Sequence, residues 1–297
     1  MIVRPRPTLL DVLFRVHGSV IPRIAVRLAV MAAVSVAAVA ATPLFPQNFH
    51  QLSAIPFTLI GLALSIFLSF RNNACYDRWW EGRKMWGRLI LDCRSLARQT
   101  QALAPHSRIT LLRGLVGFAH GLGARLRDGD EYAALAPWWD GAPKTAPNPT
   151  DALLRSLGAQ CLALLQARAI GEIQYSVLEG RLTSLGEVQA SCERIKSTPL
   201  PFAYSLLLHR TAYAFCLLLP FALAHALGWW TPVVVLIVCY TFFGLDALGE
   251  ELEDPFGVDM NDLPLDSIIR IVEREMLDAV GETSLPPKLL PRAGVLT

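Results

Sequence analysis

The sequence has little net charge. Its 297 residues carry 27 Lys and Arg against 25 Asp and Glu, which gives a formal charge of +2. No basic stripe interleaved with aromatic residues runs along the chain, so the electrostatic pattern of a nucleic-acid-binding protein is missing. We therefore expect no nucleic-acid partner.

Motifs of common catalytic and metal sites are also missing. The six cysteines form no CxxC pair and have no histidine at metal-ligand spacing, which indicates buried free thiols in a reducing compartment. GxxxxGKS, GxSxG and HExxH do not occur, and the six histidines are scattered. Because an enzyme needs a convergent set of acid–base or nucleophilic groups, we expect that the chain is not an enzyme.

No alternating strand pattern and no fixed-period repeat occur, and apolar residues dominate. Hydrophobic residues make up 53% of the chain, which is high for a soluble protein. A helix needs about 20 apolar residues to cross a bilayer. Four segments are near that length: 24–45, 54–70, 204–227 and 231–249. The sequence therefore predicts an all-α membrane protein with four transmembrane helices and a lipid bilayer as its solvent.

Lys and Arg are absent from the two short connections 43–56 and 228–232, but they are frequent in the flanking segments. By the positive-inside rule, both termini and the middle of the chain are expected on the cytoplasmic side of the inner (plasma) membrane. Trp229 and Trp230 fit an interfacial aromatic belt. The basic flanking residues include Arg4, Arg6, Arg15, Arg71, Arg78 and Lys84.

These patterns divide the chain into four parts. The middle part has helical periodicity and is expected to form a cytoplasmic helical bundle, with a Pro-, Gly- and Asp-rich loop or insertion near 128–150. The predicted parts are an N-terminal segment with two membrane helices (1–75), the cytoplasmic region (76–203), two further membrane helices (204–250), and an acidic segment with a C-terminal tail (251–297).

The stretch LIGLALSIFLSFRNNACYDRWWEGRKMW, residues 59–86, changes character in its middle. Its apolar half places Leu62, Ile66 and Phe70 four residues apart, which is a helical face that either packs on a neighbour or lines a pore. The helical spacing continues through the charged half, so one helix is expected to leave the membrane without a break. In that half, Glu81 is expected to pair with Lys84, three residues on.

The segment RNNACYDRWWEGRKMWG, together with DPFG followed by acidic residues, resembles the bestrophin family of ion channels in its bacterial branch. The similarity extends over nearly the whole chain, including the order of apolar segments. It implies a homopentamer around one axial pore that conducts monovalent ions, with four membrane helices per subunit and a cytoplasmic vestibule. The motif residues are Arg78, Trp79, Trp80, Pro255, Phe256 and Gly257.

The resemblance also implies two constrictions. Counting from the shared RWW puts the three apolar rings of the pore neck at Leu62, Ile66 and Phe70, where a hydrophobic gate can close by dewetting. Counting back from Pro201 puts the cytoplasmic aperture at Ile173. Val177 and Leu178 are the alternatives for the aperture, and all three also fit the core of the vestibule wall.

Eukaryotic bestrophins bind calcium with consecutive acids after PFG, and this run is interrupted here. Asp259 and Asp262 stand at two positions that resemble calcium ligands, with Glu251 and Asp254 nearby. Calcium needs six to eight oxygen ligands from more than one segment. The alternative is that these acids cap the helix after Leu263, and otherwise we expect no cofactor.

Ion selectivity is left open by the resemblance, because eukaryotic relatives conduct chloride through a more aromatic neck. Leu62 and Ile66 are aliphatic and offer no dipole to anions, so we favour monovalent cations. The rival function is a secondary transporter of a small ion or metabolite, which would need ionisable groups near the membrane midplane; the nearest candidates, His209 and Arg210, sit at an end of their segment. The acids that favour cations are Asp77, Glu81, Glu250, Glu251, Glu253 and Asp254.

Overall fold

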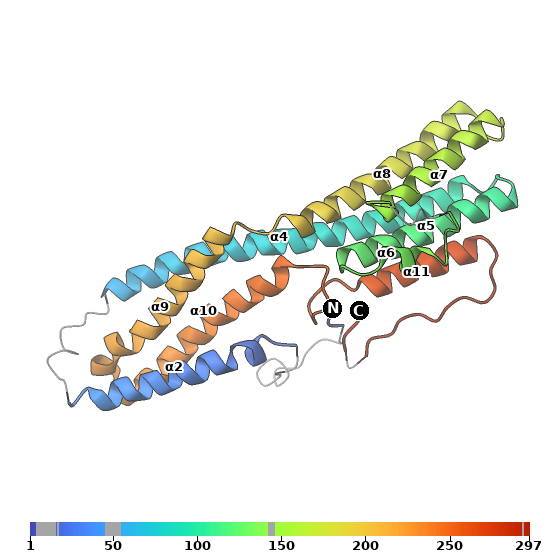
Figure 1. The fold of residues 1–297 in the computed structure, drawn as a ribbon. Helices are drawn as coiled ribbons and strands as arrows, with labels where there is room; N and C mark the ends of the chain where they lie inside the picture. Colours follow the sequence, from blue (N-terminus) through green and yellow to red (C-terminus); the bar gives the residue numbers. More distant parts are fainter. Residues whose placement is uncertain (4–15, 17, 45–54, 142–145, 293) are drawn as a thin grey trace. The chain divides into compact units, whose positions relative to one another are not determined.

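The computed structural model describes residues 1–3, 16, 18–44, 55–141, 146–292 and 294–297. Most of the expected first hairpin and the basic residues Arg4, Arg6 and Arg15 therefore lie outside the described residues. The described chain is helical, without a β-strand, which confirms the predicted all-α class (Figure 1). It divides into two compact units: unit 1 contains 1–3, 80–198 and 255–297, and unit 2 contains 4–79 and 199–254.

Unit 2 contains the apolar helices. These are α2 (Ile21–Ala41), the first part of α4 (Ile55–Gln99), α9 (Phe202–Leu227) and α10 (Thr231–Glu253). Among the described residues, the stretches 21–41, 55–99 and 202–253 are long and apolar enough to cross a membrane. Their shared core contains Ile24, Leu64, Leu68, Val235 and Phe243.

A tight reversal joins α9 to α10 in unit 2. Gly228 ends α9 with a φ of 51°, a left-handed conformation that favours glycine. The 3-10 turn η1 (Gly228–Trp230) follows, and α10 then runs back along α9 (Figure 1). Trp229 and Trp230 are exposed at this turn. This exposure is consistent with the aromatic belt expected at the membrane interface.

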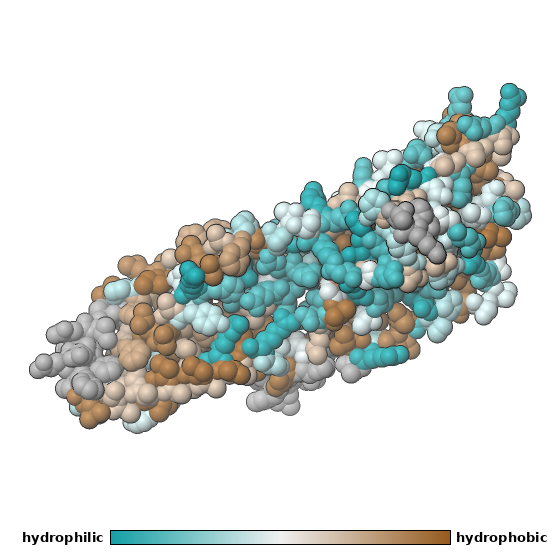
Figure 2. All heavy atoms as spheres, in the orientation of Figure 1, coloured by the Kyte–Doolittle hydropathy of each residue, from teal (hydrophilic) through white to brown (hydrophobic). Residues whose placement is uncertain are grey.

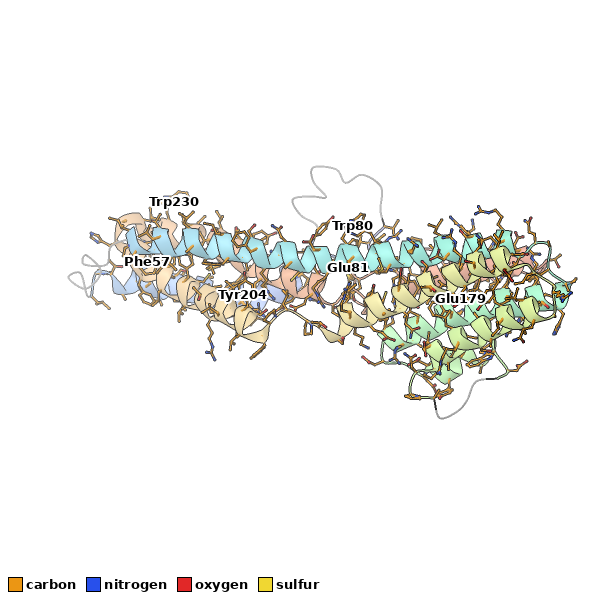
Figure 3. The ribbon with its side chains drawn as sticks, turned by 90° about the horizontal axis from the view of Figure 1, so that it is seen from above. Phe57, Trp80, Glu81, Glu179, Tyr204 and Trp230 are labelled. Carbon is orange, nitrogen blue, oxygen red and sulfur yellow. The ribbon has the colours of Figure 1, made fainter. Side chains whose placement is uncertain are left out.

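Helix α4 is continuous over its 45 residues, which confirms the expectation that it passes the charged motif without a break. Figure 3 shows Phe57 near its start and Trp80 and Glu81 further along. The pairing expected between Glu81 and Lys84 is wrong. Glu81 instead accepts a hydrogen bond at 2.5 Å from Arg194 of α8 (Glu172–Ser197), a helix that lies beside α4 in unit 1.

Unit 1 is a helical bundle around the second part of α4. Its other helices are α5 (Pro105–Leu126), α6 (Glu131–Leu135), α7 (Pro149–Gln166), α8 (Glu172–Ser197) and α11 (Leu265–Ala279). Trp86, Phe118 and Leu185 are fully buried in it. Glycines let α5 approach its neighbours closely: a Cβ on Gly121 would lie 2.7 Å from Thr150 Oγ1.

The C-terminal residues contribute to unit 1. Helix α11 packs on α5, and Ile2 forms an isolated bridge with Val295. The region that the sequence suggests as a tail thus supplies part of the bundle. In Figure 2 the surface over α2 and α9 is largely hydrophobic, whereas hydrophilic side chains gather over α5 and α8.

Candidate functional site

The three residues expected to form the pore neck lie on one exposed face of α4 in unit 2. Leu62, Ile66 and Phe70 expose 61%, 47% and 60% of their surfaces. Leu64 and Leu68 on the opposite face are buried in the core of unit 2. The stripe at 62, 66 and 70 is therefore not used for packing within the chain, which leaves it available to line a pore.

The aperture candidates near the start of α8 differ sharply in exposure. Ile173 in the first turn exposes 85% of its surface, and Val177 one turn later exposes 43%. Leu178 is fully buried among the helices of unit 1. Leu178 is therefore a core residue, and Ile173 and Val177 stay as candidates.

The two family motifs meet in the structure. Arg78 Nε donates a hydrogen bond to the carbonyl oxygen of Glu253 at 3.2 Å in unit 2. In unit 1, the ring of Phe256 lies so close to Gly82 that a Cβ there would be 3.0 Å from it. Gly82 thus leaves room for the ring of Phe256 to pack against α4. This role was not predicted from the sequence.

A buried charge network connects α2, α4, α9 and α10, the α-helices of unit 2 among the described residues. Asp246 of α10 is 1% exposed, and its Oδ1 accepts a hydrogen bond from Arg71 Nη1 of α4 at 2.7 Å. His209 Nδ1 of α9 lies 2.8 Å from Asp246 Oδ2, and Arg27 Nη1 of α2 lies 3.8 Å from the same oxygen. Asp246 therefore joins cationic or titratable side chains from α4, α9 and α2 at one buried point, and such contacts offset the cost of burying polar groups.

Asp246 lies in the fourth apolar segment, 231–249, and was assigned no role from the sequence. The signal was present, because an acidic residue within an apolar run needs a partner of opposite charge. Which cation it meets depends on the packing of α4, α9 and α2, and the spacing of residues along the chain does not give that information.

Two acidic residues after DPFG are joined by a hydrogen bond in a local turn. The carboxylate of Asp262, which is 4% exposed, accepts the backbone N–H of Asp259 at 2.7 Å. Leu263 N–H donates to the Pro255 carbonyl oxygen at 2.9 Å and closes the turn. Helix α11 begins later, at Leu265, after Pro264 as its N-cap residue, and the hydrogen bond of Asp262 lies in the turn before it.

Two carboxylates, one of them engaged with the backbone, do not supply the six to eight oxygen ligands of calcium. Glu251 is also engaged, because its Oε1 pairs with Arg23 Nε at 3.2 Å within unit 2. Asp259 and Asp262 therefore do not fit a calcium ion on their own.

The acids expected to favour cations divide into two groups. Glu81, Glu251 and Glu253 form ion pairs with arginines of their own unit. The other three, Asp77, Glu250 and Asp254, are exposed on unit 2. Among these six acids, the second group is exposed and forms no ion pair with an arginine within the described residues.

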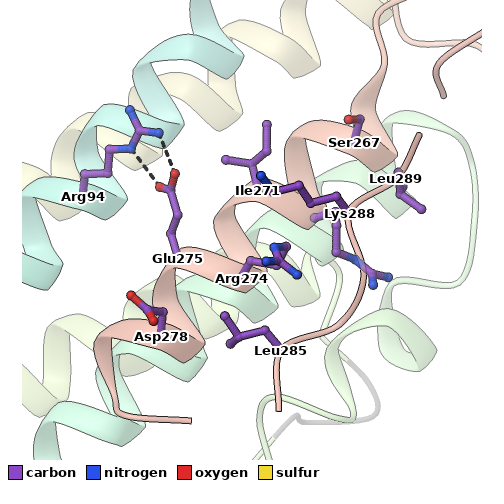
Figure 4. Close-up of a pocket in the computed structure, with 10 residues that line it drawn as sticks. Arg94, Ser267, Ile271, Arg274, Glu275, Asp278, Leu285, Lys288 and Leu289 are labelled. Carbon is purple, nitrogen blue, oxygen red and sulfur yellow. Dashed lines mark hydrogen bonds and ion pairs between the residues drawn. The ribbon is translucent and has the colours of Figure 1, made fainter. Parts of the chain in front are cut away.

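A cavity of about 570 Å³ lies in unit 1 beside α11 (Figure 4). Arg94 of α4 forms a two-pronged ion pair there with Glu275, at 2.6 and 2.8 Å. The residues that line it include Arg270, Arg274, Asp278 and Lys288. Arg270 pairs with Glu273 at 2.9 Å, so much of the positive charge is already neutralised within the chain.

The free cysteines are not reactive groups. All six are buried. In unit 1, burial raises the pKa of Cys161 to about 11 and of Cys192 to about 12, with the nearby carboxylates adding to the effect. Because the thiolate is the nucleophile and the metal ligand, these thiols supply neither function near neutral pH.

Comparison with known proteins identifies the family. The bacterial/fungal bestrophin family matches residues 1–278. The voltage-dependent anion channel-forming protein mll4386 of Mesorhizobium japonicum is 46% identical, over 98% of this chain and 95% of its own. The chain belongs to the bestrophin family. The voltage-dependent anion channel-forming protein YneE of Escherichia coli K12 is 40% identical, over 98% of both chains.

Solved bestrophin structures share the fold. The crystal structure of a bacterial bestrophin homologue from Klebsiella pneumoniae has a TM-score of 0.83 and 37% identity, covering 88% of this chain and all of that one. The predicted resemblance is therefore confirmed. Membership of the bestrophin family and the channel-forming names of its relatives also confirm that the chain is not an enzyme.

Proposed function

We propose that this bestrophin is a membrane ion channel that passes small monovalent ions through a hydrophobic neck. The observation that carries the proposal is the stripe of Leu62, Ile66 and Phe70, three large apolar side chains on a helix face that the chain itself leaves uncovered. Five copies facing one axis would form three successive apolar rings, spaced by about 6 Å along α4. Such a constriction can gate by dewetting.

The proposed assembly is a homopentamer with four membrane spans per subunit: α2, the first part of α4, α9 and α10. Two spans are counted in 202–253 because η1 reverses the chain there. Both termini and unit 1 would lie on the cytoplasmic side of the inner membrane, as the basic flanks favour. In unit 1, the exposed Ile173 would form the cytoplasmic aperture.

For selectivity we infer a preference for monovalent cations. The neck offers aliphatic rings at Leu62 and Ile66, and Asp77 and Asp254 keep exposed carboxylates. The relatives from Mesorhizobium japonicum and Escherichia coli are named anion channel-forming proteins, which makes an anion-selective channel the second candidate.

Purified protein in a planar bilayer tests the proposal. We expect current without substrate turnover, and the reversal potential in asymmetric NaCl should shift towards that of sodium. A reversal potential shifted towards that of chloride would reject the cation preference but would still support a channel. Saturable counterflow without current would reject the channel function and favour a secondary transporter.

Replacing Leu62, Ile66 and Phe70 together by Ala should raise the conductance. Smaller side chains widen the neck and reduce the apolar surface that expels water from it. The matched control replaces Val30, Val233 and Ile237, exposed apolar residues of α2 and α10, by Ala. Equal conductance in both triple variants would show that Leu62, Ile66 and Phe70 do not line the pore.

A further inference from the structure

A cluster of metal-ligating side chains lies outside the proposed neck, where α9 packs on α10 in unit 2. Asp246 and Glu250 are one helical turn apart on α10, and His209 of α9 interacts with both. One ligand atom from each of the three residues lies within 4.8 Å of the other two. In the described part of the chain, this is the one group of His, Cys, Asp and Glu side chains with that spacing.

Asp246 fixes the orientation of the His209 ring. One carboxylate oxygen accepts a hydrogen bond from Arg71 Nη1 at 2.7 Å, and the other lies 2.8 Å from His209 Nδ1, where it can accept the N–H of the ring. In the neutral ring the proton then sits on Nδ1, and the lone pair is on Nε2. That nitrogen faces Glu250 Oε1 at 3.7 Å.

Two Lewis bases thus face each other across a gap that suits an ion. The separation of 3.7 Å is too long for an N–H···O hydrogen bond. A tetrahedral zinc ion with bonds of about 2.1 Å separates two of its ligand atoms by about 3.4 Å. Glu250 is exposed, so a small rotation of its side chain closes the difference and water can reach the remaining coordination positions.

We propose that His209 Nε2 and Glu250 bind a divalent transition-metal ion of the zinc type, with water as the further ligands. Asp246 is the positioning residue, because a carboxylate on the second ring nitrogen fixes the tautomer of a metal-binding histidine. Imidazole with carboxylate favours zinc, copper or nickel over calcium and magnesium, which prefer oxygen ligands alone.

The neighbouring arginines fit this arrangement. Arg71 and Arg27 both approach Asp246, at 2.7 and 3.8 Å, and they neutralise the carboxylate that orients the ring. Glu250 lies one turn further along α10, and its Oε1 is 3.7 Å from His209 Nε2, while among the described residues no arginine forms an ion pair with it. The negative charge of Glu250 is therefore available to the metal ion.

Calorimetric titration of the full chain in detergent with zinc chloride tests the site. We expect Glu250→Gln and His209→Gln each to lose one bound zinc per chain relative to the unaltered protein. The control is His106→Gln, which removes an exposed histidine of α5 in unit 1. Asp246→Asn should weaken zinc binding by about 10- to 100-fold, because the ring loses its orienting carboxylate.

Equal zinc stoichiometry and affinity in Glu250→Gln and the unaltered protein would overturn the proposal. A loss of the same size in His106→Gln would also overturn it, because the binding would then be a general property of surface histidines. Glu250→Gln is the decisive variant, since the exposed side chain is altered without touching the buried pair of Asp246 and Arg71. The titration measures binding alone, so its result is independent of whether the chain conducts ions.

Discussion

Asp246 is the residue on which the helices of unit 2 converge. Its carboxylate contacts cationic or titratable side chains from α2, α4 and α9, and it is 1% exposed. Burying a charge is costly, and the cost is offset only while its partners stay in place. Removing one partner therefore affects the fold more than removing a surface charge does.

Arg71→Met should lower the free energy of unfolding by about 3 kcal/mol, because it leaves Asp246 buried with weaker compensation. Adding Asp246→Asn should recover part of that loss, since the uncompensated charge is then gone. Equilibrium unfolding of the single and double variants in mixed micelles measures both effects.

The control for this cycle is Arg210→Met, which removes an exposed arginine of α9 and should change the unfolding free energy by less than about 0.5 kcal/mol. Equal losses in the Arg71 and Arg210 variants would show that the buried pair contributes no more than a surface charge.

At the scale of the elements, glycines decide how closely α5 packs in unit 1. A Cβ on Gly121 would lie 2.7 Å from Thr150 Oγ1 and 2.8 Å from Leu135 Cδ2. Gly180 of α8 has no heavy atom within 4 Å of its Cβ position. The two helical glycines thus share a backbone conformation but differ in their surroundings.

Gly121→Ala should destabilise the protein by about 1–3 kcal/mol, because the added methyl group overpacks the contact with α6 and α7. Gly180→Ala should instead stabilise it by about 0.5–1 kcal/mol through helix propensity alone. Thermal unfolding of the two variants should shift the midpoint in opposite directions, and a shift of the same sign in both would contradict the packing argument.

The elements also show where sequence reasoning succeeds. The four apolar segments and the unbroken helix α4 could be predicted because hydrophobicity and helical spacing are local properties. The partner of Glu81 could not, because Arg194 is far along the chain and α8 brings it close only after folding. Asp262 was expected to cap the following helix, and in the structure its carboxylate accepts the backbone N–H of Asp259 in a local turn that ends before α11 begins.

At the scale of the whole molecule, a single chain leaves much apolar surface uncovered. Leu62, Ile66 and Phe70 of α4 are exposed in unit 2, as are Ile237 and Tyr240 of α10. Exposed apolar patches of this kind are covered by lipid or by other subunits. The resemblance gave the neck positions, and the structure adds that the chain has no internal use for them.

The proposed pentamer predicts a particle of defined mass. Light scattering with detergent correction should give a protein mass of five times the chain mass of 32.6 kDa. Replacing Leu62, Ile66 and Phe70 by Ala should leave this mass unchanged, because the stripe would face the axis and not the neighbouring helices. A protein mass corresponding to another number of copies would reject the five-fold axis.

Because its cysteines are buried, the folded protein is suited to site-specific thiol labelling. With all six thiols inside the helical units, a maleimide probe should find no native target in the folded chain. A single cysteine placed at the exposed position of Ile173 would then carry a spin label or fluorophore alone. Distances between identical labels in one particle would report how far apart the copies of that position are, without any native cysteine being replaced.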